Sequence, residues 1–338
     1  MKHILETLKA ELEKGEKAVL CTVIDNSGSC PRGKGAHMLV SEQSKTIGTV
    51  GGGRVEYETE IKAKELLKTK ENFIQDYRLC PNEVADIGMI CGGNVTILFQ
   101  YMDQSAIDFC DRALALINKH EDAWIVARIS SDFKWDMGFY TPEDGFESIE
   151  GGEDFKPLLM RKAKQNKNKD GSRLYAEPVS LAGQVYLFGG GHVAQAVAPL
   201  LHSVGFRYTL YEEREQFASP DLFPDAERIV LGGFDQIEKE IHITENDFVL
   251  IMTRGHQNDY ILQVQVLKTP ACYVGVIGSA AKYKRLCERL AEDGFSQKDI
   301  DRVITPVGLP IKAETPAEIA VSIVAQMIQV RAERFDEK

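Results

Sequence analysis

The chain has 338 residues, of which 43% are hydrophobic and 27% charged, so it can bury a sizeable core and is long enough for two domains. Its 40 Lys and Arg stand against 51 Asp and Glu. The resulting net charge of -11 argues against broad, sequence-independent binding to nucleic acid. The sequence has no run of roughly 18 apolar residues and no secretory signal pattern, so we expect a cytoplasmic protein without membrane attachment.

The seven cysteines are odd in number and contain no C-x-x-C pair. This pattern argues against a zinc ribbon, a thioredoxin motif and a disulfide framework. We expect free thiols, most of them in buried positions.

The first 120 residues predict a compact α/β domain with glycine-rich loops. An amphipathic helix is expected near residues 4–12, followed by an apolar strand at 18–24. The loop at 25–35 then holds Cys30 and Arg32 between glycines.

Two further loops of this domain have the same character. Gly51, Gly52 and Gly53 follow a strand at 46–50 and open a helical pattern that contains Glu56. Such a helix start presents backbone N–H groups to an anion. Cys91 lies in a polar loop between expected strands at 73–79 and 95–101.

The middle of the chain has weaker signals. A helix at about 105–118 and a strand at 123–129 continue the alternation, after which the pattern decays. Residues 161–173 are basic and almost free of apolar side chains, which predicts an exposed linker or hairpin tip; a docking patch for an acidic partner is the alternative. We therefore expect three regions: an N-terminal domain at 1–120, a connecting region with a basic linker at 121–182, and a C-terminal domain at 183–338.

The C-terminal domain predicts a parallel, doubly wound sheet. Apolar runs alternate with helical segments, as such a sheet requires. The strands are expected at residues 185–188, 208–211, 228–231, 248–252 and 273–277. Ligands bind at the carboxyl ends of strands in folds of this kind.

The first of these carboxyl ends has the pattern G-x-G-x-x-A, with Gly189, Gly191 and His192 in the turn. Glu212 follows about 20 residues later at the end of the next strand, where a carboxylate can bind a ribose hydroxyl pair. Strand, glycines, helix, strand and acid together predict a Rossmann-like βαβ unit. His192 either touches a bound phosphate or tolerates an unusual backbone angle.

The later carboxyl ends carry Arg254, His256 and Asp259, and then Ser279 with Lys282. His256 and Asp259 are three residues apart, a spacing that suits a base and the group that orients it, but also an ordinary helix start. Ser279 is equally suited to be a helix N-cap.

The tail begins a well-marked helix. Thr315-Pro316-Ala317-Glu318 has a capping-box pattern with proline at the first helical position, which predicts a terminal helix over residues 319–330. We expect this helix to serve packing, within the chain or across a dimer.

The order of these motifs resembles the XdhC/CoxI family of xanthine dehydrogenase accessory factors. The resemblance rests on Gly28-Ser29-Cys30-Pro31-Arg32, Gly48 to Gly53 with Glu56, Cys91-Gly92-Gly93, Gly189 to Ala194, Gly278-Ser279 with Lys282, and the tail Pro306 to Leu309 with Thr315 to Ile319. Two features depart from the family pattern: glutamate at 212, where aspartate is frequent, and the region 123–173, which has no recognisable motif.

The resemblance implies an N-terminal domain joined to a Rossmann-like domain and a role as a cofactor carrier more than a catalyst. Family members bind molybdenum cofactor (molybdopterin) while a cysteine desulfurase replaces an oxo group with sulfido. They then deliver the cofactor to apo xanthine dehydrogenase or a related molybdenum hydroxylase. The resemblance also implies a homodimer, and the net charge argues against nucleic acid as a partner.

The candidate residues suit this cargo chemically. A helix start at Gly51–Gly53 or Gly189–Gly191 can hold a phosphate, and Arg32 can add a bidentate contact. Thiolates are soft ligands for a metal such as molybdenum. We hypothesise that Cys91, or Cys30, approaches the molybdenum and that Arg32 approaches the phosphate.

Two other classes of function remain open. The first is an NAD-dependent oxidoreductase in which the Gly189–Ala194 turn and Glu212 bind NAD(P) or another nucleotide and His256 or Lys282 acts as an acid. A carboxylate at 212 favours NAD over NADP, although Arg214 weakens that inference. The second is a ligand-free scaffold that joins desulfurase and dehydrogenase through residues 161–173.

Overall fold

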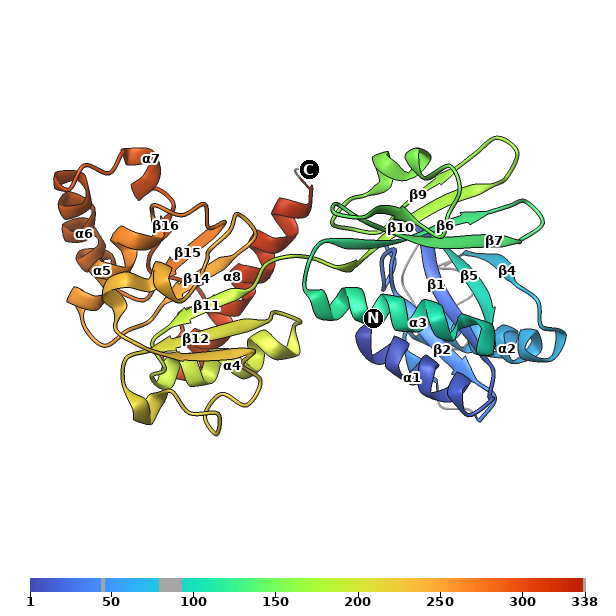
Figure 1. Cartoon of the computed structure of the whole chain (residues 1–338), viewed down its shortest axis with the longest axis horizontal. Coiled ribbons are helices and arrows are strands. Elements are labelled where there is room, and N and C mark those ends of the chain that lie inside the picture. Colours follow the sequence, from blue (N-terminus) through green and yellow to red (C-terminus); the bar gives the residue numbers. More distant parts are fainter. Residues whose placement is uncertain (44–45, 79–92, 337–338) are drawn as a thin grey trace. The chain divides into compact units, whose positions relative to one another are not determined.

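A computed structural model describes residues 1–43, 46–78 and 93–336. The chain divides into two compact units, residues 1–181 and 182–337, each with its own core (Figure 1). The second unit begins where the C-terminal domain is expected. Residues 121–181 belong to the first unit, in place of the expected connecting region.

The first unit contains two antiparallel sheets, each with five strands among the described residues. The first sheet has the order β3-β2-β1-β5-β4. Its strands are β1 (Ala18–Ser27), β2 (His37–Ser41), β3 (Ile47–Gly48), β4 (Phe73–Arg78) and β5 (Asn94–Met102). The helices of this half are α1 (Lys2–Glu13), α2 (Gly53–Thr69), the short η1 (Gln104–Ala106) and α3 (Ile107–Lys119).

The second sheet of this unit has the order β8-β7-β6-β10-β9 and forms from residues 123–180. Its elements are β6 (Ala123–Ile129), β7 (Trp135–Thr141), β8 (Gly145–Glu147), the short helix η2 (Gly152–Leu158), β9 (Lys164–Lys167) and β10 (Arg173–Ser180). Strand β10 pairs with both β6 and β9, so the basic stretch 161–173 enters an edge hairpin. Strand β6 was expected from the sequence, but its pairing with β10, about 50 residues further along the chain, is not visible in a local pattern.

The two sheets of the first unit share a buried layer. Ile24 and Leu98 of the first sheet cluster with Ile129 and Tyr175 of the second. On its other face the first sheet packs against α2, whose Ala63 and Leu66 are buried. The first sheet is therefore covered on both faces by elements of its own unit.

The second unit is built on a six-stranded sheet in which every pairing is parallel. Its order β13-β12-β11-β14-β15-β16 is the 3-2-1-4-5-6 order of a Rossmann fold. The strands are β11 (Val185–Phe188), β12 (Tyr208–Glu212), β13 (Arg228–Leu231), β14 (Phe248–Ile251), β15 (Tyr273–Val276) and β16 (Val303–Ile304). The expected doubly wound sheet is confirmed, with a short sixth strand that the sequence analysis did not find.

Helices cover both faces of this parallel sheet. They are α4 (His192–Ser203), η3 (Glu215–Phe217), η4 (Phe234–Lys239), α5 (His256–Val266), α6 (Ala280–Glu292), α7 (Gln297–Ile300) and α8 (Pro316–Asp336). On one face Val197 of α4 packs in the same core as Ile323 of α8. On the other, Leu262 of α5 packs with Leu290 of α6. Strands buried on both faces are uniformly apolar, which explains the continuous hydrophobic runs.

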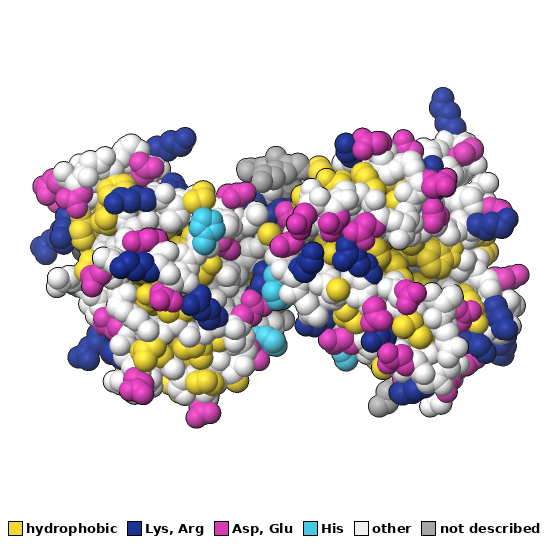
Figure 2. All heavy atoms as spheres, viewed as in Figure 1, with side chains coloured by type: hydrophobic (Ala, Val, Ile, Leu, Met, Phe, Trp, Pro, Cys, Tyr) yellow, Lys and Arg dark blue, Asp and Glu magenta, His cyan; other side chains and the backbone are white. Residues whose placement is uncertain are grey.

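Acidic and basic side chains are interspersed over both units on the face seen in Figure 2, so neither sign of charge dominates that face. Within the described residues, no helix combines the length and the apolar content needed to cross a membrane.

Candidate functional site

Two loops of the first unit and the residue before β5 meet at Pro31 and Cys30. A Cβ atom on Gly51 would lie 3.2 Å from Cβ of Pro31, and one on Gly93 would lie 2.7 Å from Sγ of Cys30. The loop after β1 therefore contacts both the turn before α2 and the start of β5. Glycine suits both positions, because it has no Cβ atom. The loop at residues 25–35 thus contacts the turn at 51–53 and Gly93, the residue before β5.

Cys30 is the half-buried thiol of this cluster. Its Sγ donates to the backbone oxygens of Ser27, at 3.2 Å, and of Asn94, at 3.3 Å. In contrast, Cys21 and Cys110 are fully buried, and burial raises the pKa of Cys110 to about 11. A thiol must lose its proton to bind a soft metal, so Cys30 is better placed than either of them for that chemistry. Cys91, the other candidate, lies outside the described residues.

The turn at Gly51–Gly53 is already engaged by its own helix. Oε2 of Glu56 accepts from the N–H of Gly52 at 3.1 Å and from the hydroxyl of Thr49. That hydroxyl oxygen accepts from the N–H of Gly51 at 3.0 Å. Glu56 therefore caps the start of α2 with a negative charge. A phosphate could use the N–H of Gly52 only by displacing Glu56, and the N–H of Gly51 only by displacing the Thr49 hydroxyl. Arg32, on the adjoining loop, is exposed.

The glycine turn of the second unit has the geometry of a nucleotide-binding turn. Gly189 has φ of 98°, and a Cβ atom there would lie 2.6 Å from the oxygen of Met252 on the neighbouring strand end. A Cβ atom on Gly191, at the N-cap of α4, would meet nothing within 4 Å, so the backbone at this position is open to a ligand. Ala194 is buried against the sheet. His192 is the first residue of α4, so it lies at the helix start expected to receive a phosphate.

Glu212 differs from the expectation that it is free to bind a ribose. Its side chain is 1% exposed, and Oε2 accepts from the N–H of Gly190 at 2.6 Å. Arg214 donates to both carboxylate oxygens at 2.9 Å. Burial raises the pKa of Glu212, but these hydrogen bonds outweigh burial, and the pKa lies below its usual value. A nucleotide ribose would have to break this arrangement, because the carboxylate is already used to fix the turn.

His256 and Asp259 both lie at the start of α5. Asp259, which is buried on α5, accepts from the hydroxyl of Thr253 at 2.6 Å. His256 is exposed at the first residue of α5.

Arg254 and Ser279 are both exposed at the carboxyl edge of the parallel sheet. Ser279 occupies the N-cap position of α6, and its side chain makes no capping hydrogen bond to the helix. Lys282 lies in the first turn of α6, and its side chain is outside the described part of the chain. The edge therefore gathers the residues expected there by position, since β12, β11, β14 and β15 are neighbours in the sheet.

The sequence analysis missed a buried polar pair in the first unit. Nε2 of His37 lies 2.9 Å from Oε2 of Glu177, and both side chains are more than nine-tenths buried. The pair joins the two sheets across a separation of 140 residues. In the sequence, His37 stands at the start of a mainly apolar strand, but nothing near it indicates Glu177 as its partner. Across residues 1–43, 46–78 and 93–336, no group of three or more His, Cys, Asp or Glu side chains is placed to hold a metal ion.

Two sequence models match separate parts of the chain. The model of the XdhC and CoxI family matches residues 11–78, which include the Cys30 loop and the turn before α2. The model of the XdhC Rossmann domain matches residues 185–327, which include the parallel sheet and its glycine turn. The chain belongs to the XdhC and CoxI family. All candidate site residues of this XdhC-family protein except Cys91 thus fall within the matched segments.

Full-length relatives agree with this assignment. The chain is 26% identical over 331 residues to a Bacillus subtilis protein named as a probable xanthine dehydrogenase subunit, covering 96% of each protein. It is 24% identical to the molybdenum cofactor insertion chaperone PaoD of Escherichia coli, covering 97% of this chain and 88% of PaoD. A crystal structure described as a xanthine dehydrogenase from Bacillus halodurans has a TM-score of 0.83 and 25% identity, covering 98% of this chain and 96% of that one.

Proposed function

We propose that this XdhC-family protein binds molybdenum cofactor and delivers it to xanthine dehydrogenase or a related molybdenum hydroxylase. The observation that carries the proposal is the alignment of 97% of the chain with PaoD, a molybdenum cofactor insertion chaperone. The Bacillus subtilis relative, whose name refers to xanthine dehydrogenase, supports a dehydrogenase as the recipient. In this role the protein is a carrier, and its work is binding and release of an intact cofactor.

We assign the cargo to the loops around Cys30 and Arg32. The cofactor carries a metal with an affinity for thiolate and a phosphate that suits a guanidinium. Cys30 supplies a thiol in a half-buried loop, and Arg32 lies two residues along the same loop and is exposed. Cys91 precedes Gly93 by two residues and is the second candidate thiol.

The finer parts of the proposal concern partners and place. The carrier holds the cofactor while a cysteine desulfurase replaces a molybdenum oxo group with sulfido, and shields the product until an apo-dehydrogenase accepts it. The carrier acts as a cytoplasmic homodimer. The exposed apolar side chains of Val321 and Ile328, seven residues apart on α8, support a self-association surface.

An anaerobic retention assay tests the carrier function. Purified protein is mixed with freshly released molybdenum cofactor, bound and free cofactor are separated by gel filtration, and molybdenum and pterin are counted per chain. We expect near-stoichiometric retention of both. Cys30→Ser, Cys91→Ala and Arg32→Ala should each weaken retention, by roughly tenfold for loss of one charge-assisted contact in the case of Arg32.

Matched controls separate the site from general effects. Cys287→Ser removes a half-buried thiol of the second unit, and Arg228→Ala removes an exposed arginine of β13; both should retain cofactor like the wild type. If the wild type and all three loop variants retain the cofactor equally well, the binding site lies elsewhere in the molecule. No retention by the wild-type protein would refute the carrier function.

A nucleotide-dependent enzyme is the second candidate, favoured by the Rossmann strand order and the open backbone at Gly191. The hydrogen bonds from Arg214 to Glu212 argue against a nucleotide-dependent enzyme, because they occupy the carboxylate that would bind the ribose. Trp124 and Trp135 both lie in the first unit, on β6 and β7, so NADH binding is best followed by the emission of NADH itself. Saturable NADH binding that is abolished by Gly191→Asp would establish a nucleotide site in the second unit.

A ligand-free scaffold remains the third class. Residues 161–173 belong to the β9–β10 edge of the second sheet, so deleting them would remove paired backbone as well as charge. Charge reversal at Lys169, in the exposed hairpin turn, is therefore the cleaner probe of a desulfurase or dehydrogenase contact.

A further inference from the structure

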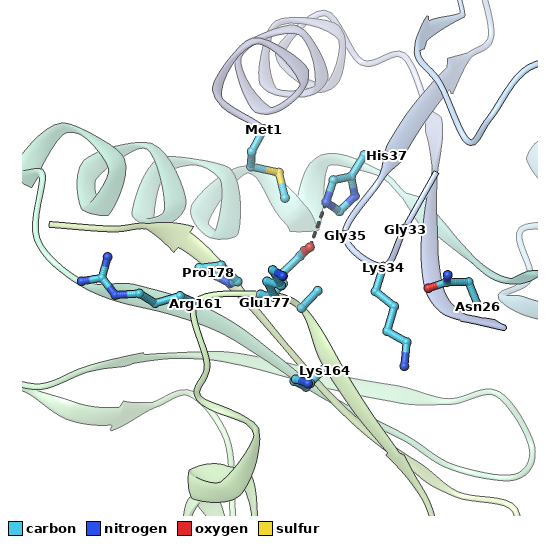
Figure 3. A pocket seen from close by; sticks show the side chains of 12 residues that line it. Met1, Asn26, Gly33, Lys34, Gly35, His37, Arg161, Lys164, Glu177 and Pro178 are labelled. Atoms are coloured by element: carbon cyan, nitrogen blue, oxygen red, sulfur yellow. Dashed lines mark hydrogen bonds and ion pairs between the residues drawn. The ribbon is translucent and has the colours of Figure 1, made fainter. Parts of the chain in front are cut away.

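A cavity of about 510 Å³ lies within the first unit (Figure 3). Its walls come from the loop after β1, the start of β2, the segment that leads into β9, and β10. Its lining includes Asn26, Lys34, His37, Arg161, Lys164 and Glu177. The volume is in the range of small-molecule sites, roughly 300–1,000 Å³.

The floor of this cavity is a buried carboxylate with one oxygen in use. Oε2 of Glu177 accepts from the hydroxyl of Tyr175 at 2.9 Å and lies 2.9 Å from Nε2 of His37. Nδ1 of His37 in turn lies 3.0 Å from the hydroxyl oxygen of Thr22. Burial, reinforced by the neighbouring Glu177, raises the pKa of Tyr175, so its phenol stays a donor. These contacts fix the carboxylate in one orientation.

The second oxygen, Oε1, is left to the cavity. Glu177 is 6% exposed and lines the cavity, and the contacts of the described residues include no hydrogen bond to this oxygen. An ionised carboxylate accepts through both of its oxygens. Oε1 is therefore a fixed acceptor for an N–H or O–H group of a bound molecule.

The walls of the cavity are cationic. Lys34, Arg161, Lys162 and Lys164 all line it, and Figure 3 shows Lys34, Arg161 and Lys164 arranged around Glu177. Asp25 pairs with Lys34 at 2.8 Å, and Asp122 lies 3.7 Å from Arg161, so at least these two cations have carboxylate neighbours. Lys164 is exposed on the edge strand β9 and makes no ion pair among the described residues. A local excess of positive charge in a protein of net charge -11 favours an anionic ligand.

The backbone opposite Glu177 leaves this space free. Gly35 has φ of 84°, and a Cβ atom there would lie 3.2 Å from Cβ of Ala163 and 3.6 Å from Oε2 of Glu177. A side chain at this position would point toward the carboxylate and narrow the cavity. The glycine therefore keeps the floor accessible from the loop side.

We propose that this cavity binds a phosphate-bearing heterocycle, with the phosphate on Lys34 and Lys164 and a ring N–H group on Oε1 of Glu177. Phosphorylated pterins and nucleotides share this chemistry. We assign the site to a phosphorylated pterin, and this assignment rests on the proposed carrier function. Lys34 lies two residues after Arg32 on the same loop, so in this proposal the two cations share the phosphate of the cargo. In this proposal the cavity recognises the pterin of the cofactor. Some of its lining residues, at 161–178, lie between the two segments that the family models match.

Titration of the full-length protein with neopterin monophosphate tests the proposal, with pterin fluorescence as the readout. The wild type should show saturable binding at one site per chain. Lys164→Glu should raise Kd about tenfold or more, because a favourable charge becomes a repulsive one. Lys167→Glu is the matched control on the same strand: Lys167 does not line the cavity, and its Kd should stay within about twofold of the wild type.

Two further arms test the two ends of the ligand. Neopterin without the phosphate should bind at least about tenfold more weakly than its monophosphate. Glu177→Gln should weaken binding of the monophosphate, and circular dichroism checks that this variant and Lys164→Glu remain folded. Guanosine monophosphate distinguishes the sources: binding tighter than that of the pterin would overturn the pterin assignment. Absence of saturable binding, or equal losses in Lys164→Glu and Lys167→Glu, would overturn the site itself.

The same variants separate this proposal from the carrier function. If wild-type protein retains molybdenum cofactor and Lys164→Glu retains it equally well, the carrier function stands and the cavity assignment fails. If wild-type protein retains no molybdenum cofactor but binds neopterin monophosphate through Lys164, the cavity stands and the carrier function fails.

Discussion

Among single residues, Glu212 illustrates how a side chain expected to bind a ligand can instead hold the site together. Its carboxylate accepts from the backbone of Gly190 in the glycine turn and from the guanidinium of Arg214, which also stacks 4.1 Å from the ring of Phe217. The hydrogen bond to Glu212 raises the pKa of Arg214, so both partners stay charged. The pair ties the end of β12 to the turn after β11.

Replacing this carboxylate should destabilise the second unit. Glu212→Gln leaves Arg214 without its counter-charge, and we expect a loss of about 3 kcal/mol in the free energy of unfolding at neutral pH. Because the pKa of Glu212 is lowered in the folded state, its contribution is complete above the unfolded value of about 4.3 and is lost as the pH falls through the folded value. Urea denaturation from about pH 7 to about pH 3 measures both effects.

The direction of this pH dependence tests whether Glu212 stabilises the second unit through its charge. The difference between wild type and Glu212→Gln should be constant near neutrality and shrink below about pH 4. Glu215→Gln, an exposed carboxylate three residues later, is the control and should unfold like the wild type. A difference that persists unchanged at about pH 3 would contradict a charge-based role.

Among the helices and strands, the ends of helices decide where ligands can approach. The start of α2 is capped by Glu56, whereas the start of α4 at Gly191 has no side-chain cap and open space before it. The start of α8 is closed again: Oε2 of Glu318 accepts from the N–H of Thr315 at 2.9 Å, and the N–H of Glu318 donates to the Thr315 hydroxyl at 3.3 Å. This confirms the capping box expected from the sequence.

Removing the α8 cap should cost about 1 kcal/mol of unfolding free energy in the second unit, the usual value for an N-cap hydroxyl. Helix α8 contributes Ile323 and Met327 to the core it shares with α4, so fraying at its start weakens that packing. Thr315→Ala followed by urea denaturation measures the loss. Thr315→Ser keeps the hydroxyl and should stay within a few tenths of a kcal/mol of wild type; an equal loss in both variants would show that the hydroxyl is not the cause.

The whole molecule consists of two units with separate cores. The first is held by two antiparallel sheets and the second by a parallel sheet, and the chain passes from one to the other at residues 181–182. All residues that line the 510 Å³ cavity belong to the first unit. The binding proposed for this cavity thus uses residues of the first unit.

Cutting the chain between the units tests whether the first unit binds by itself. A protease site inserted after Leu181 should release two folded fragments, because each keeps its own buried core. The first fragment should bind neopterin monophosphate with the affinity of the uncut protein, as measured by the same titration. The uncut insertion variant is the control. Loss of the circular dichroism signal in either fragment after cleavage would contradict separate folding.

Local sequence patterns were sufficient to predict most of the second unit. Strands β11, β12 and β14, the glycine turn and the α8 cap all follow from patterns within a few residues or one βαβ unit, because a parallel strand buried on both faces must be apolar throughout. The gathering of Gly191, Glu212 and Arg254 at one edge followed from strand direction alone. The hydrogen bonds of Glu212 did not, since they depend on which donors the folded turn brings within reach.

The pairing of β6 with β10 and the cavity of the first unit depend on long-range contacts that no local pattern contains. Strand β10 pairs Ala176 with Val126 of β6, and His37 meets Glu177 across 140 residues of chain. Local periodicity carries no information on such pairings, because an antiparallel register between distant strands is fixed by packing of the whole unit. A site built from one residue of each sheet therefore exists only once both sheets have folded together.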